Sequence, residues 1–317
     1  MRRRARWFAT VLVACLVVAL SVTPTRAAPT LVLNESRQLS PRLEELRVFS
    51  PALGRQTLVR VLVPDGFDPA RDHLPVLWLL HGGFGSERDW TVAGGAEALT
   101  QGLPLIVVMP AGGIGGWYAD WLRTPGEGRQ SWETYHLDEL RPFIEARYAA
   151  RTDRGGRAVA GLSMGGFGAI RYAARHPDLF GFAASFSGAV DLLHYGIQAI
   201  VTISPLAHQG LPGDIFGHRI LNESTWRANN PVDLAANLGD VDVEIRTGNG
   251  QPGGPHGGGF DPQEFGVWQA SKTLHEKLDS LGIDHVFQDR GPGAHNFDYW
   301  RDDLRSTLPG VMATFGG

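Results

Sequence analysis

The segment RAVAGLSMGGFGAI, residues 157–170, joins a short apolar run, a Gly-Leu-Ser-Met-Gly turn at 161–165 and the start of an amphipathic stretch. A serine in a tight strand-to-helix turn has a strained backbone, and side chains two residues either side of it would collide, so glycines are needed there. The turn lifts the hydroxyl of Ser163 clear of the sheet, and the amino end of the following helix stabilises negative charge beside it. The segment therefore predicts a nucleophilic serine between a buried strand and a helix.

Short apolar runs alternate with amphipathic stretches from about residue 45 onward. The strand candidates span residues 58–63, 76–80, 105–109, 157–161, 182–187 and 241–247, with a shorter one at 285–288. Several of them are runs of Val, Leu and Ile with little alternation, as expected of strands buried on both faces. Helical patterns span residues 132–148, 165–175, 264–281 and 299–308. This order predicts an α/β fold, with a mostly parallel central sheet covered by helices on both faces.

A second glycine turn, His81-Gly82-Gly83, directly follows the apolar run at 76–80. A turn without bulky side chains lets a backbone amide face an oxyanion. By spacing, the two amide donors would be those of Gly83 and Met164.

The general base is expected to be a histidine late in the chain, because hydrolases of this architecture run serine, then acid, then histidine. His295 follows the last strand candidate and precedes the final helical pattern, so its loop returns to the edge of the sheet where Ser163 lies. The main rival is His256, in the glycine-rich loop 253–259. His275 and His285 fit a helix and a strand as ordinary surface residues.

Two carboxylates compete for the role of the acid. After the strand candidate at 241–247 comes a glycine-rich loop, followed by Asp261 and Glu264. Either side chain would orient and stabilise the histidine, and spacing does not choose between them.

The first 27 residues have the organisation of a secretion signal. Four arginines precede an apolar run at 7–22, which is shorter than the roughly 20 residues that span a bilayer, and Thr25-Arg26-Ala27 offers small residues for cleavage before Ala28. Export with cleavage is the prediction. A membrane anchor, a lipoprotein box ending at Cys15 and a twin-arginine signal at 3–4 are the alternatives.

Composition excludes several classes of protein. Residues 28–317 carry 24 basic and 33 acidic side chains, a net charge of −9 that does not suit a nucleic-acid binder. The only cysteine of the 317 residues is Cys15, so a mature chain would lack a thiolate nucleophile and a zinc–thiolate site. His256, with no Cys or paired His nearby, is a weak metal ligand, and we expect neither a metal nor a cofactor.

Several separate motifs, in order, resemble the esterase branch of the α/β-hydrolases that includes the mycolyltransferases of the antigen 85 type. The resemblance runs from about residue 77 to 300. It is carried by the segments GLSM at 161–164, MPAGG at 109–113, YADW at 118–121, WET at 132–134, WRANNP at 226–231, GNG at 248–250 and HNFDYW at 295–300.

When the residues of that family are matched to this sequence by position, the resemblance implies that Glu264 is the acid, with Asp261 as the second candidate. It also implies that the amides of Gly83 and Met164 bind the oxyanion. One departure matters: an aspartate and an arginine that help the mycolyltransferases to bind trehalose are replaced here by His81 and Phe84. The loss of that carboxylate and guanidinium removes charge-assisted hydrogen bonds to a sugar.

We expect the substrate contacts to include His81, Phe84, Trp117 and Phe297. The predicted protein is a secreted serine esterase that hydrolyses carboxylic esters through an acyl-enzyme. Its partners would be a small-molecule or lipid ester, without nucleic acid, and peripheral association with the cell envelope is compatible with this function.

An acyltransferase that passes the acyl group to a sugar or glycerol hydroxyl is the alternative. A non-catalytic protein on the same scaffold is a third hypothesis, which the presence of all three triad residues disfavours. Residues 28–317 are expected to form one catalytic domain, in which 190–235 is an insertion or lid.

Overall fold

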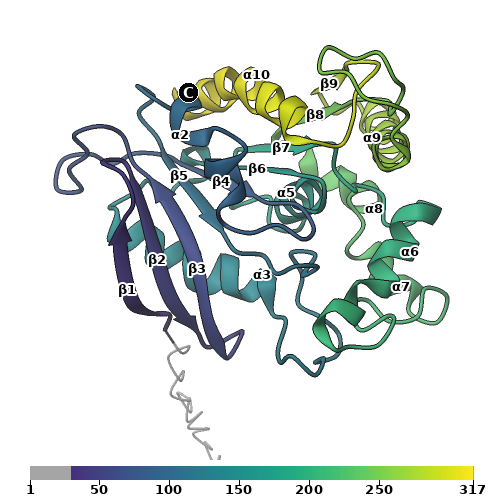
Figure 1. Cartoon of the computed structure of the whole chain (residues 1–317), viewed down its shortest axis with the longest axis horizontal. Coiled ribbons are helices and arrows are strands. Elements are labelled where there is room, and N and C mark those ends of the chain that lie inside the picture. Colours follow the sequence, from purple (N-terminus) through teal and green to yellow (C-terminus); the bar gives the residue numbers. More distant parts are fainter. Residues whose placement is uncertain (1–29, 317) are drawn as a thin grey trace, which may run out of the picture.

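The computed structural model describes residues 30–316, in which nine strands pair into one sheet in the order β1-β2-β3-β5-β4-β6-β7-β8-β9 (Figure 1). The strands are β1 (Val32–Gln38), β2 (Leu43–Ser50), β3 (Arg55–Leu62), β4 (Val76–Leu80), β5 (Ile106–Pro110), β6 (Arg157–Leu162), β7 (Phe182–Phe186), β8 (Asp242–Thr247) and β9 (His285–Asp289). The six strands from β5 to β9 in this spatial order are parallel, whereas β1, β2 and β3 are antiparallel to their neighbours.

The central strands are buried along their whole length and mostly apolar, because helices cover both faces of the sheet. Every residue of β4, β5, β6 and β7 is buried. The helices are α1 (Asp89–Val92), α2 (Ala96–Leu99), α3 (Trp132–Thr134), α4 (Arg141–Arg147), α5 (Met164–Arg175), α6 (Tyr195–Ile203), α7 (Glu223–Arg227), α8 (Pro231–Leu234), α9 (Pro262–Ser280) and α10 (Phe297–Gly316).

Two hydrophobic cores lie on opposite faces of the sheet. The larger core packs α4, α5 and α9 against one face, and the smaller core packs α1, α2 and α10 against the other. In Figure 1, α10 (yellow) lies on one side of the strands and α3 lies on the other. The expectation of a mostly parallel sheet covered on both faces is therefore confirmed.

The predicted strands and helices match the structure closely, with two corrections. All seven strand candidates are strands, and the pattern at 132–148 is α3 and α4 joined by a π-helical stretch, Tyr135–Leu140. The largely exposed strand β1 and the partly buried strand β2 were not predicted. The last helix, α10, does not end at 308 but continues through Pro309 to Gly316.

The carboxyl ends of the parallel strands meet at one edge of the sheet, where ligands bind in open α/β sheets. This edge carries the turn after β4, the elbow after β6 and the loop after β9. The segment 190–235 contains α6, α7 and α8 and no strand, and α6 lies at the same end of the molecule as the start of α9 (Figure 1).

The predicted leader, 1–27, lies outside the described residues. No helix in residues 30–316 combines the length and the hydrophobicity that a membrane span requires.

Candidate active site

Ser163 occupies the sharp turn between β6 and α5, with φ 53° and ψ −118°. A β-carbon at Gly161 would lie 2.4 Å from the carbonyl oxygen of Gly165, and one at Gly165 would lie 2.5 Å from that of Leu80. Such distances are below any van der Waals contact, so only glycine fits at both places. The strained serine backbone is held by this close packing, as in a nucleophile elbow.

Three side chains from separate elements form one hydrogen-bonded chain. The hydroxyl of Ser163 lies 2.9 Å from Nε2 of His295, so it donates to the imidazole. On the other side of the ring, Nδ1 lies 2.8 Å from Oε2 of Glu264 and donates to that carboxylate. This assignment places the imidazole proton on Nδ1 and leaves Nε2 free to accept the serine proton.

Glu264 is fully buried, and the hydrogen bonds to its second oxygen compensate for that burial. Oε1 accepts from the amide of Gly248 at 2.6 Å and from the hydroxyl of Ser187 at 2.8 Å. The guanidinium of Arg290 lies 3.6 Å from the same oxygen. Sequence reasoning missed Ser187 and Arg290, because each follows a strand without any motif around it.

The side chain of Asp261 bonds the backbone of the same histidine. It caps the amino end of α9 by accepting from the amides of Gln263 and Glu264, and its second oxygen accepts from the amide of His295 at 2.8 Å. Burial alone would raise the pKa of Asp261, but these amide hydrogen bonds lower it overall. Both acid candidates therefore contact His295, and only Glu264 bonds its imidazole.

The rival histidine lies elsewhere. His256 pairs with Asp302 at 2.8 Å, in a ring-to-carboxylate contact outside the triad.

The two amides expected to bind an oxyanion belong to residues that line one cavity with Ser163, together with Gly82. Within residues 30–316, neither the Gly83 amide nor the Met164 amide has a hydrogen-bond acceptor. A β-carbon at Gly82 would lie 2.5 Å from the side chain of Leu162, so this turn approaches the elbow closely. Free amides beside the hydroxyl of Ser163 suit a developing negative charge.

His81 does not line this cavity, which corrects the expectation that it contacts substrate. It is buried, with Nδ1 2.7 Å from the carbonyl of Gly82 and Nε2 accepting from the amide of Gly112 at 2.8 Å. Burial lowers the pKa of His81, which favours the neutral ring that these two bonds require. His81 therefore ties the glycine turn after β4 to the loop after β5.

The other three expected contacts do line the cavity, which has a volume of about 810 Å³ and opens above Ser163. Phe84 is 87% exposed in the left-handed conformation, whereas Trp117 is buried and Phe297 packs edge-on against Trp90. Most of the remaining wall is apolar and comes from the segment 194–207 and the start of α9.

The loop that carries Trp117 is held by a buried ion pair that the sequence did not reveal. Arg171 of α5 donates to the carbonyl of Tyr118 at 2.8 Å and to Glu133 at 2.7 Å. Burial alone would raise the pKa of Glu133, but bonds from His176 and Arg171 lower it overall. Trp117 and Tyr118 both have positive φ, 52° and 47°, and this network holds them there.

Three features are typical of the serine hydrolases among α/β proteins. They are the fold, the sharp turn at Ser163 and the hydrogen bonds that link Ser163, His295 and Glu264. The family model described as "Putative esterase" matches residues 50–311, and the chain belongs to this Esterase family.

Two relatives come from mycobacteria. The chain is 34% identical over 280 residues to Esterase Rv1288 of Mycobacterium tuberculosis, which covers 86% of this chain and 59% of that protein. It thus spans only about three fifths of that relative's length. The diacylglycerol acyltransferase/mycolyltransferase Ag85B of Mycolicibacterium smegmatis is 30% identical over 291 residues, 86% of each chain.

Among solved structures, a ferulic acid esterase is similar with a TM-score of 0.65 and 25% identity, covering 86% of this chain and 99% of that one. The fold is therefore that of the α/β-hydrolases, and the expected resemblance to the antigen 85 branch is confirmed.

Proposed function

We propose that this protein is an exported serine esterase that hydrolyses carboxylic esters through Ser163, His295 and Glu264. The observation that carries the proposal is the unbroken chain of hydrogen bonds, 2.9 Å and 2.8 Å long, whose serine and histidine line a mostly apolar cavity. Nucleophile, base and orienting acid are all within the distances that such catalysis needs.

In the acylation step, Oγ of Ser163 attacks the ester carbonyl carbon while Nε2 of His295 takes the hydroxyl proton. The carbonyl oxygen becomes an oxyanion that accepts hydrogen bonds from the amides of Gly83 and Met164. When the tetrahedral intermediate collapses, the bond to the alcohol oxygen breaks, and His295 returns its proton to the departing alcohol. Glu264 stabilises the charged imidazole throughout.

In the deacylation step, His295 takes a proton from a water molecule, whose oxygen attacks the acyl carbon. The same two amides hold the second oxyanion. Collapse breaks the bond to Oγ of Ser163, which regains a proton from His295, and the free acid leaves.

The cavity favours esters with an apolar acyl or alcohol part. Residues 192–213 contain no Asp, Glu, Lys or Arg, and several of their side chains line the cavity. Ile200 and Ile203 do so while remaining about half exposed. A cavity of about 810 Å³ with such walls suits a substrate that buries hydrocarbon. We assign residues 190–235 as a lid within one catalytic domain, 28–317.

Water is the proposed acyl acceptor, and acyl transfer to a sugar or glycerol hydroxyl is the second candidate because Ag85B is a relative. The turn after β4 favours water. His81 is buried and bonded to backbone on both ring nitrogens, and the exposed Phe84 offers no hydrogen bond. Neither side chain replaces the aspartate and arginine with which the mycolyltransferases hold trehalose.

The direct test is a panel of p-nitrophenyl esters from acetate to palmitate, hydrolysed by the wild type and by Ser163→Ala. We expect turnover to depend on Ser163 at every chain length and kcat/KM to rise toward medium or long chains. Equal turnover by both proteins would refute the assignment of the nucleophile.

The lid is tested with Ile203→Asn, which puts an amide on the cavity wall. We expect kcat/KM to fall about 5- to 10-fold for a dodecanoate ester and to be unchanged for acetate. The matched control is Ile220→Asn, because Ile220 is also exposed but does not line the cavity. Equal effects of the two variants would remove the lid from the proposal.

The acceptor is tested by incubating the enzyme with an ester and millimolar trehalose or glycerol, and by identifying the acyl products by mass spectrometry. Free acid should dominate in both cases. A dominant trehalose or glycerol ester would replace hydrolysis with acyl transfer while leaving the triad intact.

Export rests on the leader at 1–27, and peripheral association with the cell envelope would follow from the apolar rim of the cavity. Fractionation of cells that express the full chain, with N-terminal sequencing of the product, tests both. Retention of the uncleaved chain in the cytoplasm would refute export.

A further inference from the structure

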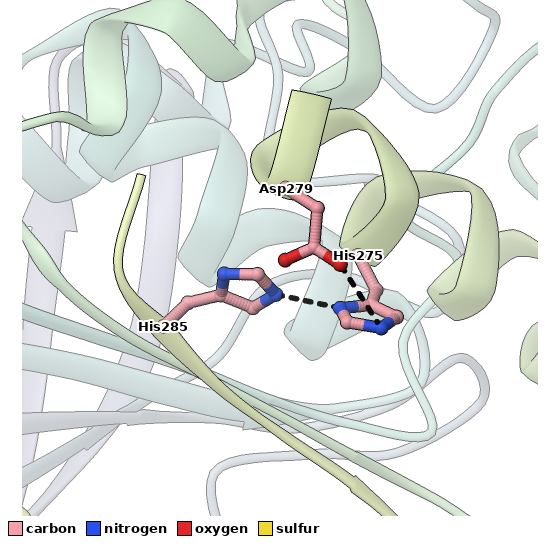
Figure 2. A group of neighbouring side chains, drawn as sticks. All are labelled: His275, Asp279 and His285. Atoms are coloured by element: carbon pink, nitrogen blue, oxygen red, sulfur yellow. Dashed lines mark hydrogen bonds and ion pairs between the residues drawn. The ribbon is translucent and has the colours of Figure 1, made fainter. Parts of the chain in front are cut away.

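Three side chains with metal-ligating atoms converge at the far end of α9 from the triad (Figure 2). His275 and Asp279 lie one turn apart on this helix, so they share a face. His285 is the first residue of the adjacent strand β9. Within residues 30–316, no other group of three or more His, Cys, Asp or Glu side chains brings its donor atoms so close together.

The donor atoms already face one another. Nδ1 of His275 lies 2.8 Å from Nε2 of His285, and a carboxylate oxygen of Asp279 lies 3.5 Å from Nε2 of His275. One ligand atom from each of the three residues lies within 4.8 Å of the others. Figure 2 shows the Asp279 carboxylate beside the gap between the two rings.

Two further contacts prepare the rings to bind a cation. Nδ1 of His285 lies 2.9 Å from the carbonyl oxygen of Ile283, which can only accept, so this nitrogen holds the ring proton. Its Nε2 therefore directs a lone pair toward His275. The ring of His275 is stacked on Phe287, with centroids 4.2 Å apart and planes within 9°, which limits its rotation. The hydrogen bond from His285 to the Ile283 carbonyl is of the kind that orients metal-binding histidines in other proteins.

We propose that His275, Asp279 and His285 form a binding site for a divalent transition-metal ion such as Zn²⁺. Imidazole nitrogen and carboxylate oxygen are ligands that Zn²⁺ prefers. Two nitrogens on a tetrahedral Zn²⁺ are about 3.3 Å apart, since each bond is about 2.0 Å long, so the rings need to separate by only about 0.5 Å. When Nδ1 of His275 binds the ion, the proton of this neutral ring moves to Nε2, and no proton is lost from the ring.

The site would be structural rather than catalytic. Glu264 precedes His275 by 11 residues on α9, which is about 16 Å along the helix axis. A metal ion held by both elements would cross-link α9 to the edge strand β9. These two elements carry Glu264 and lead to His295, so the cross-link would stabilise the frame of the triad without touching a reacting atom.

The test uses untagged full-length protein, freed of metal with a chelator and titrated with Zn²⁺ by calorimetry. We expect one Zn²⁺ per chain with a Kd in the micromolar range, and an increase in the thermal unfolding midpoint on the order of 5 °C at about 100 times that Kd. Mg²⁺, which prefers oxygen ligands, should produce neither effect. Absence of Zn²⁺ binding below about 100 μM would overturn the proposal.

His285→Gln removes a ligand from the surface of the sheet edge and should weaken Zn²⁺ binding at least tenfold. The matched control is His256→Gln, because His256 has a carboxylate partner, Asp302, 2.8 Å away but lies outside the cluster. The His256→Gln protein should bind Zn²⁺ like the wild type. In chelator, the unfolding midpoint of each variant is compared with that of the wild type, to exclude misfolding. Unchanged Zn²⁺ affinity in His285→Gln would place the ion elsewhere and overturn the proposal.

Discussion

Glu264 and Asp261 both contact His295, and exchanging each carboxylate for its amide separates their roles. In Glu264→Gln, the new NH₂ group faces either Nδ1–H of His295 or the amide of Gly248, because the carboxylate accepts hydrogen bonds on both oxygens. In either orientation two N–H donors face each other. The imidazole avoids this repulsion at Nδ1 by moving its proton to Nε2, and a protonated Nε2 cannot accept the proton of Ser163. We expect kcat to fall by about 10⁴, equivalent to about 5.5 kcal/mol of transition-state stabilisation.

Asp261→Asn should affect stability more than catalysis. Its amide oxygen still caps α9, and the lost interaction is the charged hydrogen bond to the backbone of His295, 2.8 Å long. Such a bond contributes about 2 kcal/mol to the free energy of unfolding. Because the imidazole keeps its carboxylate partner, kcat should fall by no more than about tenfold.

The assay is kcat for p-nitrophenyl butyrate at pH 7.5, with urea unfolding of each variant in parallel. A loss of 10³-fold or more in Asp261→Asn, with Glu264→Gln within tenfold of the wild type, would refute this division of roles. It would make Asp261 the acid of the triad.

Two further predictions concern the packing that supports the site. Gly165→Ala should abolish ester turnover or folding, because its β-carbon would lie 2.5 Å from the carbonyl oxygen of Leu80. The control Gly239→Ala should do neither, because the atom nearest to its β-carbon would be 4.0 Å away. Equal activities of the two variants in the ester assay would contradict the claim that the turn at Ser163 requires glycine at 165. Glu133→Gln should lower the free energy of unfolding by about 3 kcal/mol at pH 7, because it leaves the buried charge of Arg171 without its carboxylate partner. The folded-state pKa of Glu133 lies below its ordinary value, so the stability that its carboxylate contributes is present above about pH 4.5 and is lost as the pH falls. The difference in unfolding free energy between wild type and Glu133→Gln should therefore shrink toward pH 3, and urea titrations in which it grows would contradict the prediction.

The central sheet was predictable from sequence because its strands are buried on both faces and read as continuous apolar runs. The outer strands β1 and β2 are stabilised differently. Strand β1 is largely exposed, and β2 buries separate side chains such as Leu46 and Val48 instead of a continuous run. Cross-strand ion pairs such as Arg37 with Glu45 and Arg47 with Glu35 join the two strands. Such strands have no apolar run, so their pairing is visible only in three dimensions.

Helix α10 is longer than the sequence predicted, and the reason is again a tertiary contact. A proline inside a helix removes a hydrogen bond and normally marks a boundary. Here Val311 and Phe315, beyond Pro309, are buried in the smaller core, and this burial offsets the lost bond.

At the site, motifs predicted the residues of the proposed triad, which the structure brings together, and missed the residues that hold them in place. Ser163 directly follows β6, and His295 lies in the loop between β9 and α10, each within a recognisable pattern. Spacing did not separate Glu264 from Asp261, because both carboxylates contact the histidine, one at the ring and one at the backbone. His81 was misassigned because its sequence position is that of a substrate contact, whereas its ring points into the protein and bonds Gly112.

The proposed metal site was also outside the reach of sequence patterns. His275 and His285 are ten residues apart on a helix and a strand, and each alone has the pattern of an ordinary surface residue. Their rings meet only because α9 packs beside β9 in the folded chain.

The central claim, that Ser163 is an activated nucleophile, is tested most directly by covalent labelling. The full-length protein is treated with an alkyl fluorophosphonate, digested, and mapped by mass spectrometry. We expect one label per chain, on the peptide that contains Ser163, loss of ester turnover in proportion to labelling, and no label in Ser163→Ala. A label on any other residue, or ester turnover that persists after Ser163 is fully labelled, would contradict the account.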